Sequence, residues 1–564
     1  MLDILSFLND TLYDGLPYAL ICLSFVLTAK YIRFPDVTCS GSFVFGAAIA
    51  ATAIVRAGLN PVVAVVFAAI GGAAAGALTG FFFTVLRLDR LLSGILSAFV
   101  LYSVNLMLLT PTLAYGDRRT LFSLFEERDR LIVAANVGWH PWVIGLLLVV
   151  VLSAKVMLDR FLRSEVGLAM RCLEDEQAGE YALERHGLAP IRLKILALCL
   201  GNAIVAVTGA LVSFKEGAAN AQRGFDVLIT GLVAFLLGEQ LLKLVQRISA
   251  VAVKQWTARL RPTSGAIGGG LAYFALMTFS QRLHVASEYT KIALVALVAL
   301  SAAPATSIFG TVLRRRRPLG SSDGAESLLD VERLAFKYPS ADKDSLQQLS
   351  FTVRPGQVLQ LAGGNGVGKT TALRLVAGFL DAQERGRILF KGADLTGNRH
   401  ERLKRIAYVD QSADRGVVGC LTTQENLALA AMGSHPSVWR NALRPSTVEH
   451  VARVLDRSPF GPEILRRRAD QLSGGQRQVL NLLTLLAKRD LPELVLLDEP
   501  TNNLDADNTE RCRRIIKTLH DDGAAIVIVS HARFEGITIN RVVEVNGADI
   551  IDPVIASGNN GEEQ

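Results

Sequence analysis

Apolar residues dominate the first 310 positions of the chain. Residues 13–310 contain repeated long runs of apolar and small residues, such as PVVAVVFAAIGGAAAGALTGFFFTVL at 61–86. A helix that crosses a bilayer needs roughly 20 such residues, so the runs predict about nine membrane spans. The predicted spans lie near 13–29, 40–56, 61–86, 91–110, 141–158, 193–213, 226–243, 265–281 and 291–310.

The sequence changes character after the basic run Arg314–Arg317. Beyond it, charged and apolar residues mix as in an ordinary soluble protein. We therefore predict a multi-domain chain, with a polytopic α-helical membrane domain followed by a soluble domain. The predicted boundaries are 1–312 for the membrane domain, 313–327 for a Gly/Ser-rich linker, 328–553 for the soluble domain and 554–564 for a disordered polar tail.

The composition agrees with this division. The chain is 50% hydrophobic with a mean hydropathy of +0.34, which is unusually apolar for a soluble protein of this length. The net charge of +7 could indicate nucleic acid binding, but the basic residues cluster where cytoplasmic loops are expected. We therefore expect lipid and no nucleic acid as a partner. The six cysteines are scattered, so they indicate neither disulfides nor a metal held by cysteine ligands.

Loop charges predict the orientation of the membrane domain, because cytoplasmic loops carry an excess of Lys and Arg. An N-terminus outside the cell places the denser basic loops inside. These loops contain Lys30 and Arg33, Arg87 and Arg90, and residues 160–194, 243–261 and 314–317. We therefore expect a multi-pass membrane protein with the soluble domain in the cytoplasm.

Small and polar residues recur within the predicted spans. Gly72, Gly76 and Gly80 are spaced four apart, which lets helix backbones approach closely in lipid, and we interpret them as packing residues. Polar residues in or near spans are costly in lipid, so they either line a transport path or join helices. They are Asp36, Asn105, Asn202, Asp226 and Glu239.

A long charged loop at 159–192 follows the fifth predicted span. Its apolar positions have helical spacing, which a free loop would not need and a segment pressed against a cytoplasmic partner would. We predict that this loop couples the membrane domain mechanically to the soluble domain. The spaced residues are Leu168, Cys172, Ala178, Tyr181 and Leu183.

The stretch VLQLAGGNGVGKTTALRLVAGFL at 358–380 predicts a strand, a glycine-rich loop and a helix. In this setting G-x4-G-K-T is a phosphate-binding P-loop. Its backbone N–H groups would surround a β-phosphate, Lys369 would reach the β/γ oxygens and Thr370 would bind Mg²⁺. ATP and Mg²⁺ are the expected cofactors. The predicted nucleotide-binding residues of the loop are Gly363, Gly364, Asn365, Gly366, Val367, Gly368, Lys369, Thr370 and Thr371.

Two further apolar stretches predict strands that deliver polar residues to the same sheet edge. LVLLDEP at 494–500 ends in two carboxylates. Asp498 suits the Mg²⁺ shell, and Glu499 suits a catalytic base that polarises water. AAIVIVS at 524–530 ends at His531, which could contact a γ-phosphate.

These motifs together resemble the ATPase domain of ATP-binding cassette (ABC) transporters over essentially all of 328–553. The resemblance implies that Tyr338 stacks on adenine, that Gln411 senses Mg²⁺ and contributes to catalysis, and that His531 is the switch histidine. It also identifies the signature LSGGQ at 472–476 and a D-loop at 502–505. The implied nucleotide contacts from these two motifs are Ser473, Gly474, Gly475, Gln476 and Asp505.

The signature loop contains no lysine to meet a phosphate. In ABC domains this loop is implied to face the phosphate held by the P-loop of the other copy. One chain carries one P-loop and one signature, so two chains in twofold symmetry would complete two sites. A homodimer is therefore expected, and a heterodimer with a paralogue remains the alternative.

The membrane half resembles permeases of the branched-chain amino acid and ribose importer group. The likeness is carried by FPDVTCSGSFVFGAAIAA at 34–51, LDRLLSGILSAFVLYSVNL at 88–106 and SEVGLAMRCLEDEQAGEYALERHGL at 164–188. It implies an ATP-hydrolysing importer of a small polar solute, such as an amino acid, that works with a separate extracytoplasmic solute-binding protein. It also implies that the chain lies in the cytoplasmic (inner) membrane of a bacterium.

Two other functions remain open at this stage. A half-size ABC exporter also fuses one membrane domain to one ATPase, but such exporters usually have about six long helices rather than nine short spans. A non-transport ATPase with a membrane anchor or signalling partner would not need so many spans.

Overall fold

The computed structural model describes most of the chain. The described residues are 4–109, 121–123, 141–216, 218–220, 223–248, 261–285, 289–290, 327–338, 345–364, 366–380, 386–433, 436–456, 460–502, 504–530, 534, 537–546 and 549–551. Internal contacts divide the chain into two compact units. The first contains residues 1–162 and 191–309, and the second contains residues 163–190 and 310–564. The predicted linker up to 326 and the predicted tail lie outside the described residues.

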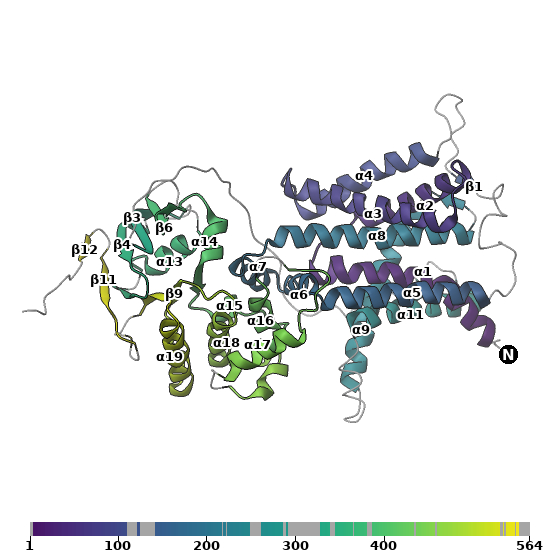
Figure 1. Ribbon diagram of the computed structural model, residues 1–564. Helices are drawn as coiled ribbons and strands as arrows, with labels where there is room; N and C mark the ends of the chain where they lie inside the picture. Colours follow the sequence, from purple (N-terminus) through teal and green to yellow (C-terminus); the bar gives the residue numbers. More distant parts are fainter. Residues whose placement is uncertain are drawn as a thin grey trace, which may run out of the picture. The chain divides into compact units, whose positions relative to one another are not determined.

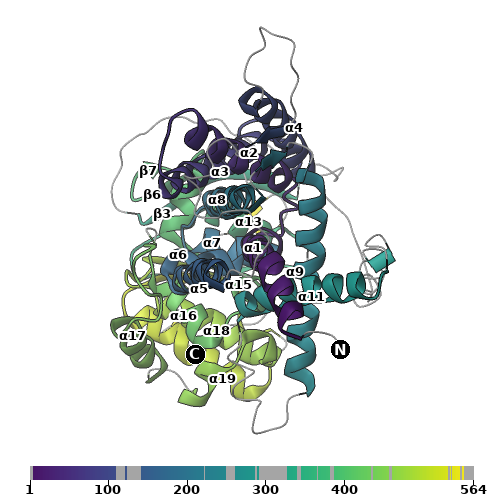
Figure 2. The ribbon, with the colours of Figure 1, turned by 90° about the vertical axis from the view of Figure 1, so that its right-hand side faces the viewer.

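The first unit is a bundle of long apolar helices (Figure 1). They are α1 (Ile4–Phe25), which continues as the π-helical turn η1 (Val26–Tyr31), α2 (Thr38–Val55), α3 (Pro61–Thr84), α4 (Arg90–Leu109), α5 (Pro141–Arg163), α8 (Pro190–Glu216), α9 (Gly224–Ile248) and α11 (Pro262–Arg282). A short antiparallel pair, β1 (Leu121–Ser123) and β2 (Ala218–Asn220), accompanies them. In Figure 2, α5 and α8 are seen nearly end-on, and α9 stands nearly upright to their right.

Eight of the nine predicted spans coincide with these helices, and the ninth, at 291–310, lies outside the described residues. Six described helices are long and apolar enough to cross a membrane: α1 with η1, α2, α3, α4, α8 and α9. The helices α5 and α11 are not among these six. Of the roughly nine predicted spans, six are therefore supported by the length and composition of the described helices.

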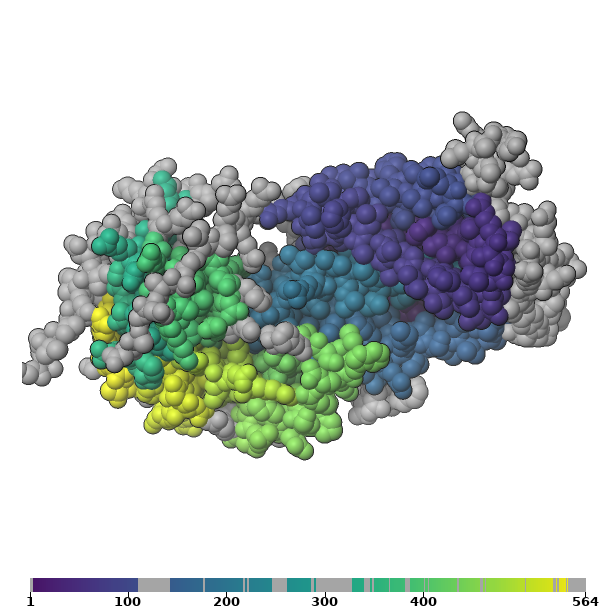
Figure 3. All heavy atoms as spheres, turned by 45° about the horizontal axis from the view of Figure 1, so that its top comes forward, coloured from purple at the N-terminus to yellow at the C-terminus, as the bar shows by residue number. Residues whose placement is uncertain are grey.

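Burial differs between these helices. In α2 the most apolar window is 72% buried, whereas in α3 and α4 the corresponding values are 33% and 28%. Large apolar side chains such as Val66, Phe67 and Ile70 lie on the outside of α3, and Figure 3 shows the outer surface of α3 and α4 in blue and purple. Outward apolar surface of this kind fits a lipid environment.

The glycines of α3 pack directly on α8, as their spacing predicts. A Cβ atom added to Gly72 would lie 2.4 Å from the Asn202 carbonyl oxygen, and one added to Gly76 would lie 2.3 Å from that of Leu198. At Gly80 the nearest atom is 3.0 Å away, on the side chain of Ile195. The backbones of α3 and α8 are therefore closest at the first two glycines.

The intramembrane polar residues Asp36 and Asn202 contact each other. Asn202 Nδ2 donates a hydrogen bond of 2.7 Å to Asp36 Oδ2, and Ser42 Oγ donates one of 2.6 Å to Asn202 Oδ1. The Thr38 N–H donates to Asp36 Oδ1 at 3.1 Å. These contacts join the start of α2 to α8, so the structure gives both residues a helix-joining role.

Two other polar residues of the predicted set also have interhelical contacts. Asn105 Nδ2 donates to the Gly41 carbonyl at 3.1 Å, and Glu239 forms a 2.9 Å ion pair with Lys30. A polar group that gains a partner across helices escapes much of the cost of burial in lipid.

The second unit is built on two sheets. The larger has the strand order β12-β11-β5-β10-β9-β8, and the smaller has the order β4-β3-β6-β7. Neighbours among β8, β9, β10, β5 and β11 pair in parallel. The strands are β3 (Leu329–Phe336), β4 (Leu346–Val353), β5 (Val358–Ala362), β6 (Arg387–Phe390), β7 (Ala393–Asp394), β8 (Ile406–Val409), β9 (Leu494–Asp498), β10 (Ala525–Val529), β11 (Arg541–Asn546) and β12 (Asp549–Ile551).

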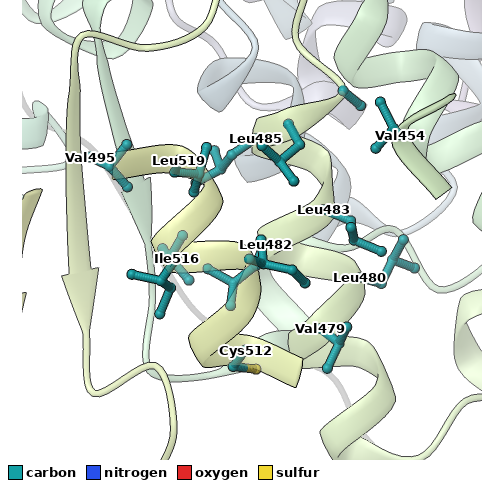
Figure 4. Packing of buried hydrophobic residues seen from close by; sticks show 14 of the residues in the cluster. Val454, Val479, Leu480, Leu482, Leu483, Leu485, Val495, Cys512, Ile516 and Leu519 are labelled. Carbon is teal, nitrogen blue, oxygen red and sulfur yellow. The ribbon is translucent and has the colours of Figure 1, made fainter. Parts of the chain in front are cut away.

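Helices cover this sheet and complete the core. They are α13 (Lys369–Ala377), α14 (Arg399–Arg405), α15 (Ala413–Gly416), α16 (Thr423–Ala431), α17 (Pro445–Asp456), η4 (Pro462–Arg466), η5 (Ala469–Gln471), α18 (Gly474–Leu486) and α19 (Ala506–Asp521). Figure 4 shows Leu482 and Leu485 of α18 facing Ile516 and Leu519 of α19, beside Val495 of β9. This cluster fixes α18 against the strand that carries Asp498.

Two short helices from the predicted coupling loop belong to the second unit. They are α6 (Glu165–Cys172) and α7 (Glu176–Arg185), which follow α5 in sequence. Ser164 caps α6 and Asp175 caps α7 through bonds to the N–H groups of Gly167 and Ala178. The helical spacing read from the sequence is confirmed here.

Candidate nucleotide site and signature helix

The P-loop has the backbone geometry that its glycines predict. Gly363, Gly366 and Gly368 have φ angles of 142°, 81° and 97°. A Cβ atom at Gly368 would also lie 2.4 Å from the Ser345 carbonyl oxygen, so a side chain there is excluded by space as well as by conformation. The helix α13 begins immediately afterwards, at Lys369, which places the N–H groups of its first turn next to the loop.

The Lys369 side chain lies within the loop. Its Nζ atom donates hydrogen bonds to the carbonyl oxygens of Gly363 and Gly364, at 2.6 and 2.7 Å. The residue is 6% exposed. A buried ammonium beside the N-terminus of a helix forms a concentrated positive site, which matches the chemistry of phosphate oxygens.

Asp498, at the end of β9, is held through both of its carboxylate oxygens. Thr370 Oγ1 donates to Oδ1 at 3.1 Å, and the Tyr408 hydroxyl donates to Oδ2 at 3.1 Å. Burial raises the pKa of Asp498 above its usual value, and the two hydrogen bonds oppose this rise. A threonine hydroxyl beside a carboxylate is a donor set that fits Mg²⁺, so Thr370 and Asp498, two of the three residues predicted for the metal, lie together. The third, Gln411, contacts Glu499 instead.

Glu499 contacts Gln411, another residue predicted to contribute to catalysis. Gln411 Nε2 donates to Glu499 Oε2 at 3.0 Å, and Asn502 Nδ2 donates to the same oxygen at 2.7 Å. Glu499 has a φ angle of 45°, which is unusual for a residue with a side chain. Its N–H group bonds to the Val529 carbonyl at 3.0 Å. This bond fixes the strained turn at the end of β9.

The signature loop starts a helix. Ser473 is the N-cap of α18, and its hydroxyl accepts a bond from the Gln476 N–H while the Gln476 side chain accepts one from the Ser473 N–H. This reciprocal capping box leaves the N–H groups of Gly474 and Gly475 at the helix start. The free N–H groups of a helix N-terminus attract anions.

The start of α18 also contacts the first turn of α19, directly after the D-loop. Asp505 caps α19 by accepting bonds from the Asn508 N–H and Nδ2, at 2.7 and 2.9 Å. A Cβ atom at Gly475 would lie 2.6 Å from Asn508 Nδ2. A side chain at position 475 would therefore require Asn508 to move.

The remaining predicted residues have these places. The Tyr338 hydroxyl lies 3.4 Å from Thr371 Oγ1, and the Tyr338 ring makes an edge contact with Phe336. Val367 packs on the core below the loop. Asn365 and His531 lie outside the described residues.

Sequence reasoning missed two contacts of this site, those made by Tyr408 and Asn502. Tyr408 and Asn502 bond directly to the carboxylates of Asp498 and Glu499. A tyrosine in the otherwise apolar strand β8 could have been noticed as a polar group that needs a buried partner. Asn502 lies in the predicted D-loop at 502–505, but nothing in the sequence shows that its side chain reaches Glu499.

The predicted coupling helices make charged contacts with the rest of the second unit. Glu165 forms 3.0 Å ion pairs with Arg440 and Arg444, and Arg171 forms one of 2.8 Å with Glu425. The Arg185 guanidinium, at the end of α7, is buried. Burial lowers its pKa to about 10, an effect that the neighbouring charge of Asp410 opposes.

Two family models match the chain. Residues 7–299 match the branched-chain amino acid transport system permease component, and residues 346–502 match the ABC transporter ATPase. The chain belongs to the ABC transporters, with permease and ATPase fused.

Several individual relatives are similar to parts of this ABC transporter. The sulfate/thiosulfate import ATP-binding protein CysA of Vibrio cholerae is 35% identical over 211 residues, covering 36% of this chain and 53% of that protein. The phosphonates import ATP-binding protein PhnC of Alcaligenes faecalis is 31% identical over 242 residues, covering 40% and 85%. The tyrosine transport system permease protein of Clostridioides difficile is 28% identical over 239 residues, covering 42% and 75%. This chain thus spans about half the length of the first of these relatives.

Proposed function

We propose that the protein is an ATP-driven importer of a small polar solute, working as a dimer in a bacterial inner membrane. One observation carries the proposal: the same chain matches a permease family and also brings the P-loop, Asp498 and Glu499 into the contacts described above. A membrane domain of this kind moves a solute, and the second unit holds the residues expected of an ATPase.

The importing direction and the solute class rest on relatives. Two of the similar ATP-binding proteins are named for import. The similar permease is named for tyrosine transport, and the permease-family model is named for branched-chain amino acids. We therefore propose an amino acid or a comparable small polar solute, delivered by a separate extracytoplasmic solute-binding protein.

The described residues divide the chemistry of ATP hydrolysis among them. Bound MgATP supplies the phosphoryl group whose transfer to water releases free energy. Lys369 and the P-loop N–H groups would hold phosphate oxygens, while Thr370 and Asp498 would hold the metal. Glu499 orients the water and accepts its proton, and Gln411 and Asn502 hold the Glu499 carboxylate in place.

The signature serine is the reason to propose two chains. Ser473 and the start of α18 present N–H groups and a hydroxyl, but the signature LSGGQ at 472–476 contains no lysine to meet a phosphate. A second copy would supply the P-loop and Lys369 opposite them, so each site would contain residues of both chains. Formation and loss of this interface would switch the dimer between two states of the membrane domain.

The helices α6 and α7 are proposed to carry this switch to the permease. They lie between α5 and α8 in sequence, yet they group with the ATPase. Any displacement of the ATPase elements that hold Glu165, Arg171 and Arg185 would therefore pull on the ends of two membrane helices.

The proposal is tested by purifying the Glu499→Gln protein from the membranes of its own organism, with and without ATP. We expect a solute-binding protein to co-purify in one nucleotide state and its bound ligand to name the solute. Lys369→Ala, which removes the phosphate contact, is the matched control and should not show the nucleotide dependence. Absence of any solute-binding protein in both states, together with ATP-driven efflux from vesicles, would overturn the importing direction.

A further inference from the structure

Tyr408 lies between the predicted metal site and the coupling helices. It belongs to β8, whose four residues are all buried, and it is itself 1% exposed. Its hydroxyl donates to Asp498 Oδ2 at 3.1 Å. Since Thr370 donates to the other oxygen of that carboxylate, Thr370 and Tyr408 together hold the orientation of the carboxylate.

The same hydroxyl is connected to the catalytic side of the site. Arg374 Nε lies 3.4 Å from the Tyr408 hydroxyl, and Arg374 Nη2 bonds to Asp410 Oδ2 at 3.0 Å. Asp410 directly precedes Gln411, which contacts Glu499. One arginine thus joins the residue that holds Asp498 to the segment that holds Glu499.

The ring of Tyr408 connects the site to α7 through two further aromatic rings. Its centroid lies 5.5 Å from that of Phe379, and Phe379 stacks on Tyr181 of α7 at 4.3 Å with an interplanar angle of 19°. Three aromatic rings therefore link α7 to Asp498 without a gap. Protein interiors are close-packed, so a displaced ring moves its neighbours rather than compressing the space between them.

We propose that Tyr408 is a positioning residue that orients Asp498 for its metal and lets α7 alter that orientation through Phe379. The proposal rests on the proposed ATPase function. A shift of Tyr181 would move the Phe379 ring and then the Tyr408 ring, which would lengthen the hydroxyl bond to Asp498. The affinity of the site for metal would thereby depend on the position of the coupling helix.

The two tyrosines of this chain of rings differ in a way that supplies a control. The Tyr408 hydroxyl has a hydrogen-bond partner, whereas the buried Tyr181 hydroxyl has none among the described residues. Only the ring of Tyr181 can therefore transmit its position. Tyr181→Phe keeps the ring and should leave the site unchanged, while Tyr181→Ala removes the contact with Phe379.

The test measures Mn²⁺ binding by electron paramagnetic resonance in the full-length protein, with a non-hydrolysable ATP analogue. Tyr408→Phe should weaken Mn²⁺ binding about three- to tenfold, since it removes one hydrogen bond to the carboxylate. Nucleotide affinity without metal, measured in EDTA, should stay the same. Tyr181→Ala should weaken Mn²⁺ binding in the same direction, and Tyr181→Phe should not change it.

The outcomes separate this inference from the proposed function. Wild-type protein that binds no nucleotide would overturn the proposed function itself. Wild-type binding with unchanged Mn²⁺ affinity in Tyr408→Phe would overturn only the role of Tyr408. Weakening in Tyr408→Phe without an effect of Tyr181→Ala would overturn the connection to α7. If Tyr408→Phe does not fold, Phe379→Leu, which removes the middle ring and keeps the hydroxyl, must weaken Mn²⁺ binding for the proposal to survive.

Discussion

Arg185, the last residue of α7, donates a hydrogen bond from its buried guanidinium to the side chain of Asn481 in the middle of α18. It also donates to the Gly416 carbonyl at 3.4 Å. Because α18 starts directly after the signature serine Ser473, the loop between two membrane helices is tied to the element expected to face a second ATPase domain. This contact makes α18 a direct mechanical partner of the coupling segment.

Replacement of Arg185 by Ala should therefore destabilise the second unit and uncouple ATP hydrolysis from transport. The loss of the buried hydrogen bonds and of packing should cost about 1–3 kcal/mol. Thermal unfolding of the full-length protein measures the first effect, and the ratio of solute moved to ATP hydrolysed measures the second.

The matched control for this variant is Arg405→Ala. Arg405 forms an exposed i,i+4 ion pair with Glu401, so its removal should change stability by less than about 0.5 kcal/mol. An Arg185→Ala protein that unfolds like the control and keeps normal coupling would refute the role given to this contact.

Glu165 anchors the other end of the coupling segment. Its buried carboxylate accepts bonds of 3.0 Å from both Arg440 and Arg444, and one of 2.9 Å from the Ser437 N–H. Glu165→Gln keeps the size but removes the charge, and we expect a loss of about 1–3 kcal/mol because charge-assisted bonds are replaced by weaker ones.

The Glu165→Gln effect should persist at high salt, because the carboxylate is buried and little screened. Denaturant unfolding at low and at high ionic strength checks this. A loss that disappears in salt would mean that Glu165 acts only through long-range surface attraction.

Lys488 gives the second unit a pH dependence. Its Nζ atom donates to the Arg185 carbonyl at 3.4 Å, and burial, with a smaller effect from the charge of Arg185, lowers the pKa of Lys488 to about 7. The unfolded chain binds the proton up to a pKa near 10.4, so between these two values it holds more protons than the folded chain. Stability should therefore rise with pH across this window.

Lys488→Met should remove that slope and stabilise the protein at neutral pH, because the penalty for burying the charge is present there in the wild type. Unfolding midpoints at pH 7, 8 and 9 compare the two proteins. Parallel pH curves for wild type and variant would show that the ammonium of Lys488 is hydrated in the folded state.

Much of this site was readable from the sequence because it is local. The P-loop, Asp498 and Glu499 follow strands whose apolar residues are consecutive in the chain, so the sheet edge can be inferred from each segment alone. The Tyr408 to Asp498 bond could not be inferred, since it depends on how β8 and β9 align. The amphipathic pattern of the 159–192 loop predicted that it would have a partner, but not that Arg185 would reach Asn481.

A mixed-dimer experiment tests whether each site needs two chains. Ser473→Arg should abolish hydrolysis while leaving nucleotide binding intact, and Lys369→Ala should abolish it by removing the phosphate contact. In a mixed dimer, one site would combine the normal P-loop of the first chain with the normal signature of the second. Co-expression should therefore restore about a quarter of wild-type ATPase activity, since random pairing gives mixed dimers half of the time and each has one intact site.

Separately purified variants, combined under conditions that prevent exchange of chains, are the control and should stay inactive. Co-expressed chains that show no recovery, although pull-down proves that they pair, would mean that the signature acts within its own chain.

The close contact of α3 and α8 leads to a final prediction about the permease. A Cβ atom at Gly76 would overlap the Leu198 carbonyl, so Gly76→Ala must push the two helices apart and should destabilise the first unit by about 1–3 kcal/mol. Gly145 of α5 has no atom within 4 Å of such a position, and Gly145→Ala should be neutral or slightly stabilising, since alanine favours helix. Thermal unfolding in detergent compares the two.

Because the glycine contact lies in the first unit and the ATPase residues lie in the second, the ATP affinity of Gly76→Ala should match that of the wild type. A Gly76→Ala protein as stable as Gly145→Ala would show that α3 and α8 separate enough in the membrane to admit a methyl group.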